Sequence, residues 1–454
     1  MCAEISRRNM LTLMASSSAL PFLPNIAVAA GQGFQAIVLS DLHSAYERMG
    51  QLLAVIERQI ATASVPQIIL INGDIFELGN VVATRSAGEI DWAFLDALAK
   101  LAPTVVNIGN HEPDLDNDLA HFVERARGLG ITVLSNIVDK RTGKPYAEAG
   151  KEIEIGGLKV KLAAFATDAI GTYPKPTREM MDIPKPVEWA KANLPTLLAG
   201  EGVNIVLSHA GVVPDRDILP IVPDGTLMIG GHDHLTLTHS QGETRYIHTG
   251  SWSSAMMVAT FKAAGKAPEL ARIEIDRAGP SSAVLKDLVP AVLAKHLKDD
   301  ERTVVAKTSK AMTLGETARF AAEAMAAKTG ADIGFIGHTS FGTGLPAGDV
   351  TRFDYNAGLR FEGKLMVSDV DATVLMAILA RCNQDGDIPL AGRTGDFLYA
   401  SPKAPEGKAR FKIVCNDWSA INKKSYFGRE DIVFTEVPDL KLKQLVAETL
   451  AKKA

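Results

Sequence analysis

The sequence predicts an α/β fold, and three observations lead to that prediction. Short aliphatic and β-branched runs, typical of buried strands, recur at 36–39, 67–71, 104–108, 203–207 and 227–229. Segments with helical spacing alternate with these runs, as they do in sheets built from strand–helix–strand units. Each run also ends in a short polar cluster, which is where α/β sheets form their ligand sites.

The segments between the runs have patterns of their own. Residues 46–61 place Met49, Leu52 and Ile56 at helical spacing, which predicts an amphipathic helix that covers the sheet. Residues 172–186 are rich in proline, threonine and charge, so we expect a loop that overhangs the polar clusters.

The strand and helix pattern breaks at residues 278–280, Ala-Gly-Pro. We therefore expect a first domain over 30–280 and a second over 303–454. The linker over 281–302 is predicted to be mostly one helix, from 284 to 302. A chain of 454 residues is long enough for two or three domains of ordinary size.

Composition narrows the choice of partner. Hydrophobic residues make up 46% of the chain and charged residues 22%, which are ordinary values for a globular protein. The formal net charge is −5 and the pI is near 6.1, and the sequence has no basic stripe. These features argue against a nucleic-acid polymer as partner and favour a small molecule.

The N-terminus predicts where the protein works. Residues 6–11, Ser-Arg-Arg-Asn-Met-Leu, resemble the twin-arginine export motif, and a moderately apolar stretch and the small residues 27–29 follow. This order is typical of a cleavable signal peptide, here 1–29, and the apolar part is too short for a membrane anchor. We expect export to the periplasm by the twin-arginine machinery. A general secretory signal is the alternative and leads to the same place.

Five polar clusters carry the candidate chemistry: Asp41-Leu42-His43, Gly73-Asp74, Gly109-Asn110-His111, Ser208-His209 and Gly231-His232-Asp233-His234. Together they supply carboxylates, an amide and imidazoles. This inventory suits Mn, Zn or Fe as divalent ions better than Ca or Mg. Cysteine is missing from the clusters, which argues against a structural zinc–thiolate site. Because every cluster follows a strand, we expect them to build one site.

In this order the clusters resemble the motifs of the calcineurin-like metallophosphoesterases. The resemblance spans Asp41 to His234. It implies a four-layer α/β/β/α sandwich that holds two divalent metal ions. It assigns Asp41, His43 and His234 to one ion, Asn110, His209 and His232 to the other, and Asp74 to both.

The resemblance also implies a reaction. Two ions bring four positive charges against the two negative charges of Asp41 and Asp74, so the centre would attract a small anionic substrate. A water that bridges the ions would lose a proton near neutral pH and attack phosphorus in line. The metals would stabilise the oxyanion that develops.

His111 directly follows the assigned ligand Asn110 but is not itself assigned to either ion. The run 109–114, Gly-Asn-His-Glu-Pro-Asp, resembles the periplasmic and cell-surface 5′-nucleotidases, in which the aspartate orients the histidine ring. The resemblance makes His111 a general acid or transition-state stabiliser and Asp114 its orienting residue. Alternatively, Asp114 caps a helix that begins near Leu115. The two roles can coexist.

Two other polar residues near the clusters receive supporting roles. Asp233 lies between two assigned ligands, so we expect its side chain to point away and serve the loop. His248 follows a strand-like segment, and we expect it to pack behind the ligands or support them.

The chain has three cysteines. Cys2 would leave with the signal peptide, so Cys382 and Cys415 remain. In an oxidising periplasm these two can form a disulfide. Two buried thiols are the alternative, and the sequence leaves both open.

The second domain resembles the C-terminal domain of the 5′-nucleotidases over 348–380 and 411–418. In that family two aromatic side chains from these segments sandwich the nucleobase, and Phe361 and Trp418 fall at those positions. Stacking a base on an aromatic face contributes roughly 1–3 kcal/mol. The alternative is that both rings pack in the core.

The same domain departs from the family in two places. The Asn-Gly-Gly-Gly-x-Arg segment is replaced by residues 337–343, which contain no arginine, and the Gly-Gly-Asp motif is replaced around 423–425. Losing a bidentate guanidinium weakens recognition of a phosphate or carboxylate. Arg352 or Arg360 could compensate.

The sequence as a whole predicts a periplasmic, dinuclear-metal phosphoesterase that hydrolyses nucleotides or related phosphate esters. One alternative is the thiosulfohydrolase of bacterial sulfur oxidation, which shares the two-domain build and which residues 418–422 resemble faintly. Another is a non-catalytic protein of the same fold that binds anions. The complete ligand set with His111 argues against the binding protein, because capture needs no general acid.

Overall fold

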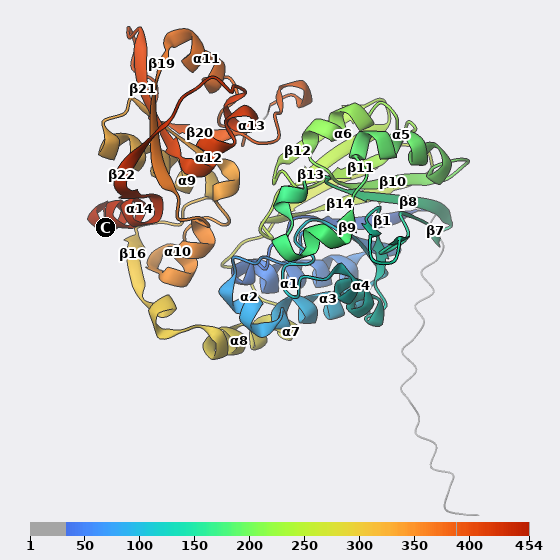
Figure 1. The fold of residues 1–454 in the computed structure, drawn as a ribbon. Helices are drawn as coiled ribbons and strands as arrows, with labels where there is room; N and C mark the ends of the chain where they lie inside the picture. Colours follow the sequence, from blue (N-terminus) through green and yellow to red (C-terminus); the bar gives the residue numbers. More distant parts are fainter. Residues whose placement is uncertain (1–32, 387, 454) are drawn as a thin grey trace, which may run out of the picture.

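The computed structural model describes residues 33–386 and 388–453, so the predicted signal peptide over 1–29 lies outside the described residues. The chain forms two lobes (Figure 1). The first lobe, blue to yellow-green, contains the sheets built from residues 34–274, and the second, yellow to red, contains the strands from residue 304 onward. A yellow helical segment connects the lobes at the bottom of the view.

The first sheet of the N-terminal lobe has the strand order β15-β14-β1-β2-β3-β4. The strand bounds are β1 Phe34–Leu39, β2 Gln67–Asn72, β3 Thr104–Asn107, β4 Thr132–Leu134, β14 Ala255–Phe261 and β15 Glu269–Glu274. Strands β1 to β4 run parallel, and β14 and β15 pair antiparallel at one side. The carboxyl ends of β1, β2 and β3 therefore meet at one edge, with the predicted clusters directly after them.

The second sheet has the strand order β12-β13-β11-β10-β8-β7. Its bounds are β7 Gly150–Ile155, β8 Leu158–Ala166, β10 Val203–His209, β11 Leu227–Gly230, β12 Thr236–Gln241 and β13 Thr244–Thr249. Strands β8, β10, β11 and β13 run parallel, while β7 and β12 pair antiparallel. His209 and the cluster at 231–234 therefore lie at the carboxyl edge of this sheet.

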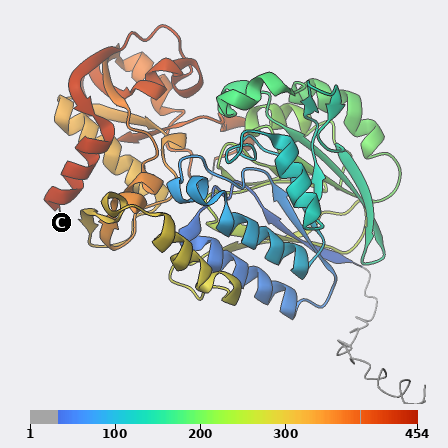
Figure 2. The ribbon, with the colours of Figure 1, turned by 60° about the horizontal axis from the view of Figure 1, so that its bottom comes forward.

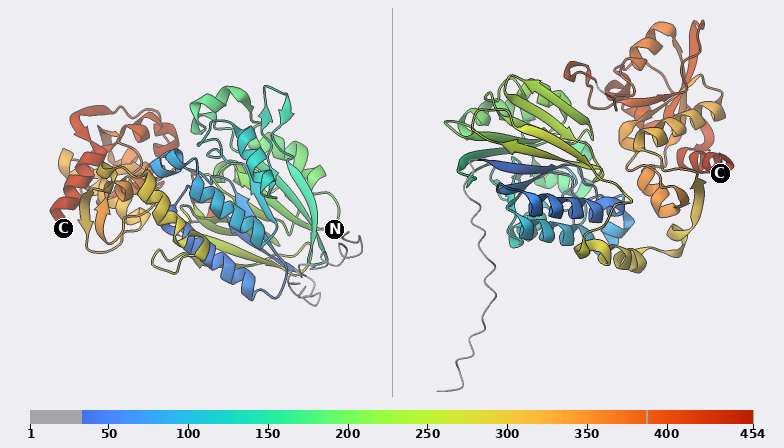
Figure 3. Two further views of the ribbon diagram at one scale, coloured as in Figure 1. Left: turned by 90° about the horizontal axis from the view of Figure 1, so that it is seen from below. Right: turned by 180° about the vertical axis from the view of Figure 1, so that it is seen from behind.

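The two sheets stack face to face, with helices on their outer faces (Figure 3). The helix bounds are α1 Tyr46–Thr62, α2 Val81–Ser86, α3 Glu89–Leu101, α4 Leu119–Gly128, α5 Pro186–Leu197 and α6 Val212–Ile218. Alternate residues of β1 belong to different cores: Val38 packs between the sheets with Ile229, and Ile37 packs on the α1 side with Leu52. The predicted four-layer α/β/β/α arrangement is confirmed.

The linking segment lies beside the blue helices of the first lobe (Figure 2). It consists of α7 Ala283–Lys286, α8 Leu288–His296 and a 3₁₀ turn, Asp299–Arg302. The prediction of one helix over 284–302 was therefore wrong. Pro290 has no N–H to donate to the carbonyl of Lys286 four residues earlier, so the helical hydrogen bonds are interrupted at this point.

The second lobe is built around a sheet of order β20-β17-β21-β19-β22. The strand bounds are β17 Ile333–Gly337, β19 Lys364–Asp371, β20 Leu398–Ser401, β21 Arg410–Asn416 and β22 Thr435–Lys441, and β16 Val304–Thr308 pairs separately with β18 Gly348–Thr351. The helices are α9 Leu314–Thr329, α10 Arg352–Gly358, α11 Ala372–Leu379, α12 Asp417–Ile421, α13 Lys423–Phe427 and α14 Leu442–Lys453. This lobe is mixed α/β, as predicted.

The segment at 172–186 has more structure than the predicted loop. The 3₁₀ turns Ile170–Thr172 and Lys175–Met180 precede β9 Met181–Asp182, which pairs with β5 Val138–Asp139, and β5 pairs with β6 Lys144–Pro145. Tyr173 is buried, and its hydroxyl donates to the Thr167 carbonyl at 2.9 Å. A buried aromatic anchor explains why a proline-rich segment packs against the lobe here.

Two further sequence predictions concern the chain beyond the sheets. Among the described residues, Cys382 and Cys415 are both free, buried thiols, so the disulfide alternative is wrong for this structure. Within residues 33–386 and 388–453, no helix is long and apolar enough to cross a bilayer.

Candidate active site

The loops after the strands hold their polar residues in an uncommon backbone conformation. Asp41, His43, Asp74, His232 and His234 all have positive φ, with values of 53°, 50°, 57°, 76° and 55°. Non-glycine residues rarely adopt this region, and those that do cluster at functional sites. The strain is shared by three different loops, which indicates that the sheets and the packing of the loops impose it.

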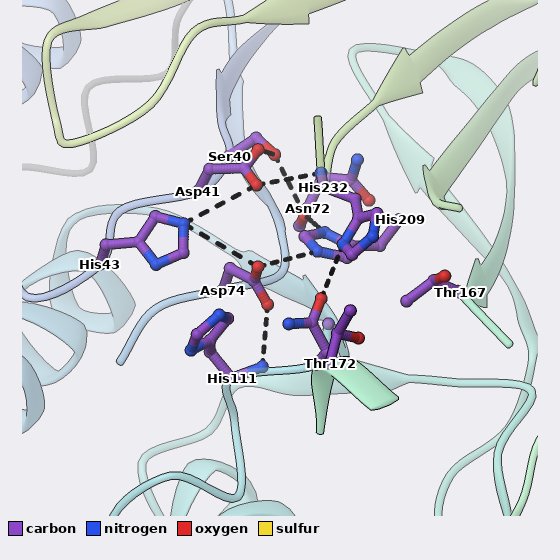
Figure 4. A network of polar contacts seen from close by, with 12 residues as sticks. Ser40, Asp41, His43, Asn72, Asp74, His111, Thr167, Thr172, His209 and His232 are labelled. Carbon is purple, nitrogen blue, oxygen red and sulfur yellow. Dashed lines mark hydrogen bonds and ion pairs between the residues drawn. The ribbon is translucent and has the colours of Figure 1, made fainter. Parts of the chain in front are cut away.

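The first group of candidate ligands contains Asp41, His43, Asp74 and His234, whose ligand atoms all lie within 4.8 Å of one another. The Nε2 atoms of His43 and His234 are 2.8 Å apart. His43 Nε2 is 4.0 Å from Asp41 Oδ1 and 3.9 Å from Asp74 Oδ2. Figure 4 shows the side chains of Asp41, His43 and Asp74 directed toward one another.

The second group contains Asp74, His209 and His232, again within 4.8 Å. His209 Nε2 lies 3.1 Å from Asp74 Oδ2, and Asn110 Oδ1 lies 2.8 Å from His232 Nδ1. His209 Nδ1 donates to the Asn72 carbonyl at 2.6 Å, which leaves Nε2 as the coordinating atom. Asp74 is the residue that belongs to both groups.

The histidines of the two groups differ in the direction in which their surroundings shift the pKa. Burial lowers the pKa of His232 to about 4 and, with the neighbouring His43, holds the pKa of His234 well below its usual range. Burial also acts to lower the pKa of His209, but Asp74, Asp41 and the Asn72 carbonyl together raise that pKa to about 10. Two imidazoles are thus neutral, the form that binds metal, while a proton on His209 occupies a position that suits a cation.

These groups fit divalent metal ions. Buried His209 Nε2 has no hydrogen-bond partner among the described residues, although a carboxylate faces it, and the donors are imidazole, carboxylate and amide. Such mixed nitrogen and oxygen donors suit first-row transition ions. The sequence predicted all seven of the residues, and the structure brings them together.

His111 lies beside the groups with its predicted partner. Its Nδ1 is 2.7 Å from Asp114 Oδ2, which also accepts from the Leu78 N–H at 2.7 Å. Burial acts to lower the pKa of His111, but Asp114 and then Asp74 raise it to about 10. The alternative cap role is wrong, because helix α4 begins at Leu119 and the side chain of Asp118 accepts from the first turn.

Several residues of the site were not predicted from the sequence. Buried Glu77 lies 3.3 Å from His43 Nδ1, and the ring of Trp252 stacks on His43 with centroids 4.7 Å apart. Asn72 and Asn107 join the two sheets, since Asn72 donates to the Ser208 carbonyl and Asn107 donates to Asn72 Oδ1, both at 2.9 Å. No spacing signal marks these residues, although Asn at the end of a buried strand is unusual enough to suggest a polar bridge.

The supporting roles expected for Asp233 and His248 agree with their contacts. Asp233 Oδ2 accepts from the Val212 N–H at 2.5 Å, so its side chain holds the start of α6. Burial raises the pKa of Asp233 to about 7. His248 is buried beneath Gly230 and hydrogen-bonds the Tyr246 hydroxyl at 2.5 Å, behind the ligands.

The two predicted base-stacking residues are exposed at the surface of the second lobe. Phe361 is 47% exposed and Trp418 49% exposed, so the core-packing alternative is wrong for both. Their rings do not contact each other within the described part of the chain. Arg360 connects Phe361 to the metal groups, because its guanidinium lies 5.1 Å from the Phe361 ring and donates to Glu77 at 2.6 Å.

The comparisons with known proteins agree with this geometry. Residues 34–235 match the family model of the calcineurin-like phosphoesterases. The chain is similar in structure to a 5′-nucleotidase precursor from Thermus thermophilus, with 19% identity, a TM-score of 0.59 and coverage of 93% of this chain and 96% of that one. For a sulfate thiohydrolase from the same organism the values are 16%, 0.63, 92% and 94%. For a 5′-nucleotidase from Candida albicans they are 14%, 0.57, 92% and 98%.

None of the curated proteins compared with the chain matches it. The family match over residues 34–235 and the ligand groups support a metal-dependent hydrolase of phosphate esters. Over 92–93% of the chain, the fold is similar to that of these two 5′-nucleotidases.

Substitution of single ligands tests the two groups. We expect Asp74→Asn to lower the bound metal content more than either His234→Ala or His209→Ala, because Asp74 belongs to both groups. Elemental analysis of dialysed protein measures this, with His121→Ala, an exposed histidine on α4, as the matched control. Wild-type metal content in Asp74→Asn would contradict the arrangement.

Proposed function

We propose that the chain is an exported hydrolase that uses two divalent metal ions to cleave phosphate esters of nucleotides or related small molecules. The observation that carries the proposal is the pair of ligand groups joined at Asp74, with His111 beside them. Mn, Zn or Fe would suit the donors. One ion would be held by Asp41, His43 and His234, the other by Asn110, His209 and His232, and Asp74 would contact both.

When bound, the ions would supply positive charge that lowers the pKa of a coordinated water and stabilises the oxyanion of the transition state. The chain's own residues account for the remaining steps. The Nδ1–H of His111 is held by Asp114, so the ring directs Nε2 away from that carboxylate. As an oxygen from water bonds to phosphorus, the bond from phosphorus to the leaving oxygen breaks and His111 Nε2 gives its proton to that leaving oxygen.

Exposed aromatic side chains of the second lobe support a substrate class. Phe361 and Trp418 present half-exposed rings, which suit the flat face of a base. The 5′-nucleotidases among the structural relatives support a nucleotide as substrate. The sulfate thiohydrolase among them is the reason to test a sulfur compound as the alternative substrate. Arg352 donates to the Asp300 carbonyl in the linking segment, so of the two candidate arginines only Arg360 is at the metal groups.

Turnover of a substrate panel tests the reaction. We expect phosphate release from nucleotides, sugar phosphates or cyclic nucleotides with added Mn²⁺. His111→Ala should lower kcat by about 10²–10⁴-fold, because the leaving oxygen loses its proton donor. His121→Ala is the control. Sulfate release from a sulfur-carrier conjugate, or binding of the phosphate esters without turnover, would overturn the proposed phosphoesterase activity. A normal kcat in His111→Ala would overturn the role of His111 as proton donor.

Removal of the exposed rings tests the base contact. We expect Phe361→Ala and Trp418→Ala each to raise KM for a nucleotide by roughly 5- to 150-fold, the equivalent of 1–3 kcal/mol of stacking. KM for a sugar phosphate should not change. Met376→Ala, which truncates an exposed side chain on α11, is the control. Equal effects on both substrates would show that the rings do not bind a base.

Export is the remaining part of the proposal and rests on the motif at residues 6–11. Replacing both Arg7 and Arg8 by lysine should leave the precursor in the cytoplasm, because the twin-arginine route depends on the pair. Fractionation of cells followed by immunoblotting measures this. Unchanged periplasmic protein in the double variant would contradict the twin-arginine route.

A further inference from the structure

We infer that Arg360 is a positioning residue of the metal centre: from the second lobe it holds Glu77, which orients His43, so that docking of the lobes and metal binding strengthen each other. The inference rests on the metal assignment of the proposed function. It goes beyond that function because it gives the second lobe a part in building the centre as well as in binding substrate.

The contacts form an unbroken chain from one lobe to the other. Arg360 Nη2 donates to Glu77 Oε2 at 2.6 Å, and the same carboxylate oxygen lies 3.3 Å from His43 Nδ1. The other oxygen of Glu77 accepts from the Gly79 N–H at 2.8 Å. Glu77 therefore has one contact each from its own loop, from the candidate ligand and from the second lobe.

The ion pair is buried, which makes the loss of one partner costly. The Arg360 side chain is only 11% exposed and that of Glu77 only 7%. Removing one member of a buried ion pair leaves an uncompensated charge, and the remaining group moves toward water or another partner. Glu77 without Arg360 would therefore leave the position in which it faces His43.

Trp252 forms a second connection between the same residues. Its ring stacks on His43, and the Arg360 guanidinium lies 5.2 Å from its centroid. The backbone N–H of Trp252 donates to the Asp41 carbonyl at 2.8 Å, and the residue has a positive φ of 58°. Arg360, His43, Glu77 and Trp252 together line a cavity of about 150 Å³ between the lobes.

The second lobe also contacts the loop that carries the other histidines. His338 Nε2 donates to the carbonyl of Asp233 at 3.0 Å, between His232 and His234. The His338 ring is fixed by stacking on Phe397, with centroids 4.2 Å apart. Thus the lobe supports two of the ligand loops, one through a side-chain relay and one through the backbone.

The relay acts on a specific atom. Glu77 faces His43 Nδ1 at 3.3 Å, so Nε2 is the ring nitrogen directed at the other ligands. Losing a carboxylate that orients a metal-binding histidine typically weakens metal binding by about 10–100-fold. Because coupling between two equilibria is reciprocal, metal binding must tighten the contact between the lobes by the same factor.

The relay from Arg360 through Glu77 to His43 is tested on the full chain by measuring the metal affinity of Arg360 variants in two single-ligand variants. In His209→Ala, which retains the group that contains His43, we expect Arg360→Ala to raise the Kd for Mn²⁺ by about 10–100-fold, measured by competition with a chelator. In His234→Ala, which retains the group that contains His209, Arg360→Ala should change the Kd little. Arg360→Lys should recover part of the affinity. The matched control is Arg352→Ala, an arginine remote from the centre.

A second readout follows the lobes without substrate. Adding Mn²⁺ to wild-type protein should slow hydrogen exchange at the amides of 338–343, and the effect should be lost in Arg360→Ala. Equal Kd changes in both backgrounds would show general destabilisation and overturn the relay. Unchanged Kd with a raised KM for a nucleotide would make Arg360 a substrate-binding residue and also overturn it.

The test separates the relay from the proposed function. If His43→Ala leaves Mn²⁺ affinity unchanged, the metal assignment fails. If His43→Ala weakens binding while Arg360→Ala does not, only the relay fails. If both weaken binding but no phosphate ester is cleaved, the relay stands and the proposed reaction fails.

Discussion

The carboxylate of Asp74 lies between two groups of ligand side chains, and the geometry of the whole centre depends on its being held there. Its Oδ1 accepts from the backbone N–H of His111 at 2.9 Å, while Oδ2 faces His209 Nε2 at 3.1 Å. The backbone of Asp74 is left-handed, and a Cβ at residue Gly109 would lie 2.4 Å from Oδ1. Backbone conformation and a glycine therefore fix the carboxylate independently of any ion, which is how a site is preorganised.

The stacked sheets explain why distant loops reach the same point. Parallel strands of both sheets end at one edge, and Asn72 and Asn107 hold those ends together with buried hydrogen bonds. Buried hydrogen bonds of this kind hold the two sheets in one geometry, because breaking one in the low dielectric of the interior costs free energy. The aromatic and ionic contacts of Trp252 and Arg360 extend the same support into the second lobe.

The sequence predicted the residues that local patterns mark, and it missed the contacts between residues far apart in the chain. Asp41, Asn110 and His209 follow strand-like runs, so their position and residue type marked them as candidates, and the resemblance to the family motifs assigned them as ligands. Glu77 and Arg360 are 283 residues apart, and nothing in either neighbourhood specifies their pairing. The helix expected near residue 115 begins at 119, where Asp118 caps its first turn. Asp114 instead bonds His111 and accepts from the Leu78 N–H, and the second of these is a tertiary contact that local pattern does not show. The exposure of Phe361 likewise depends on how the lobes dock, which local pattern does not encode.

Anomalous diffraction from crystals grown with Mn²⁺ tests the central claim most directly. Two peaks about 3.5–4 Å apart are predicted, one on each side of the Asp74 carboxylate. One should contact the group with His43 and His234, and the other the group with His209 and His232. A single peak, or peaks that do not contact Asp74, would contradict the account.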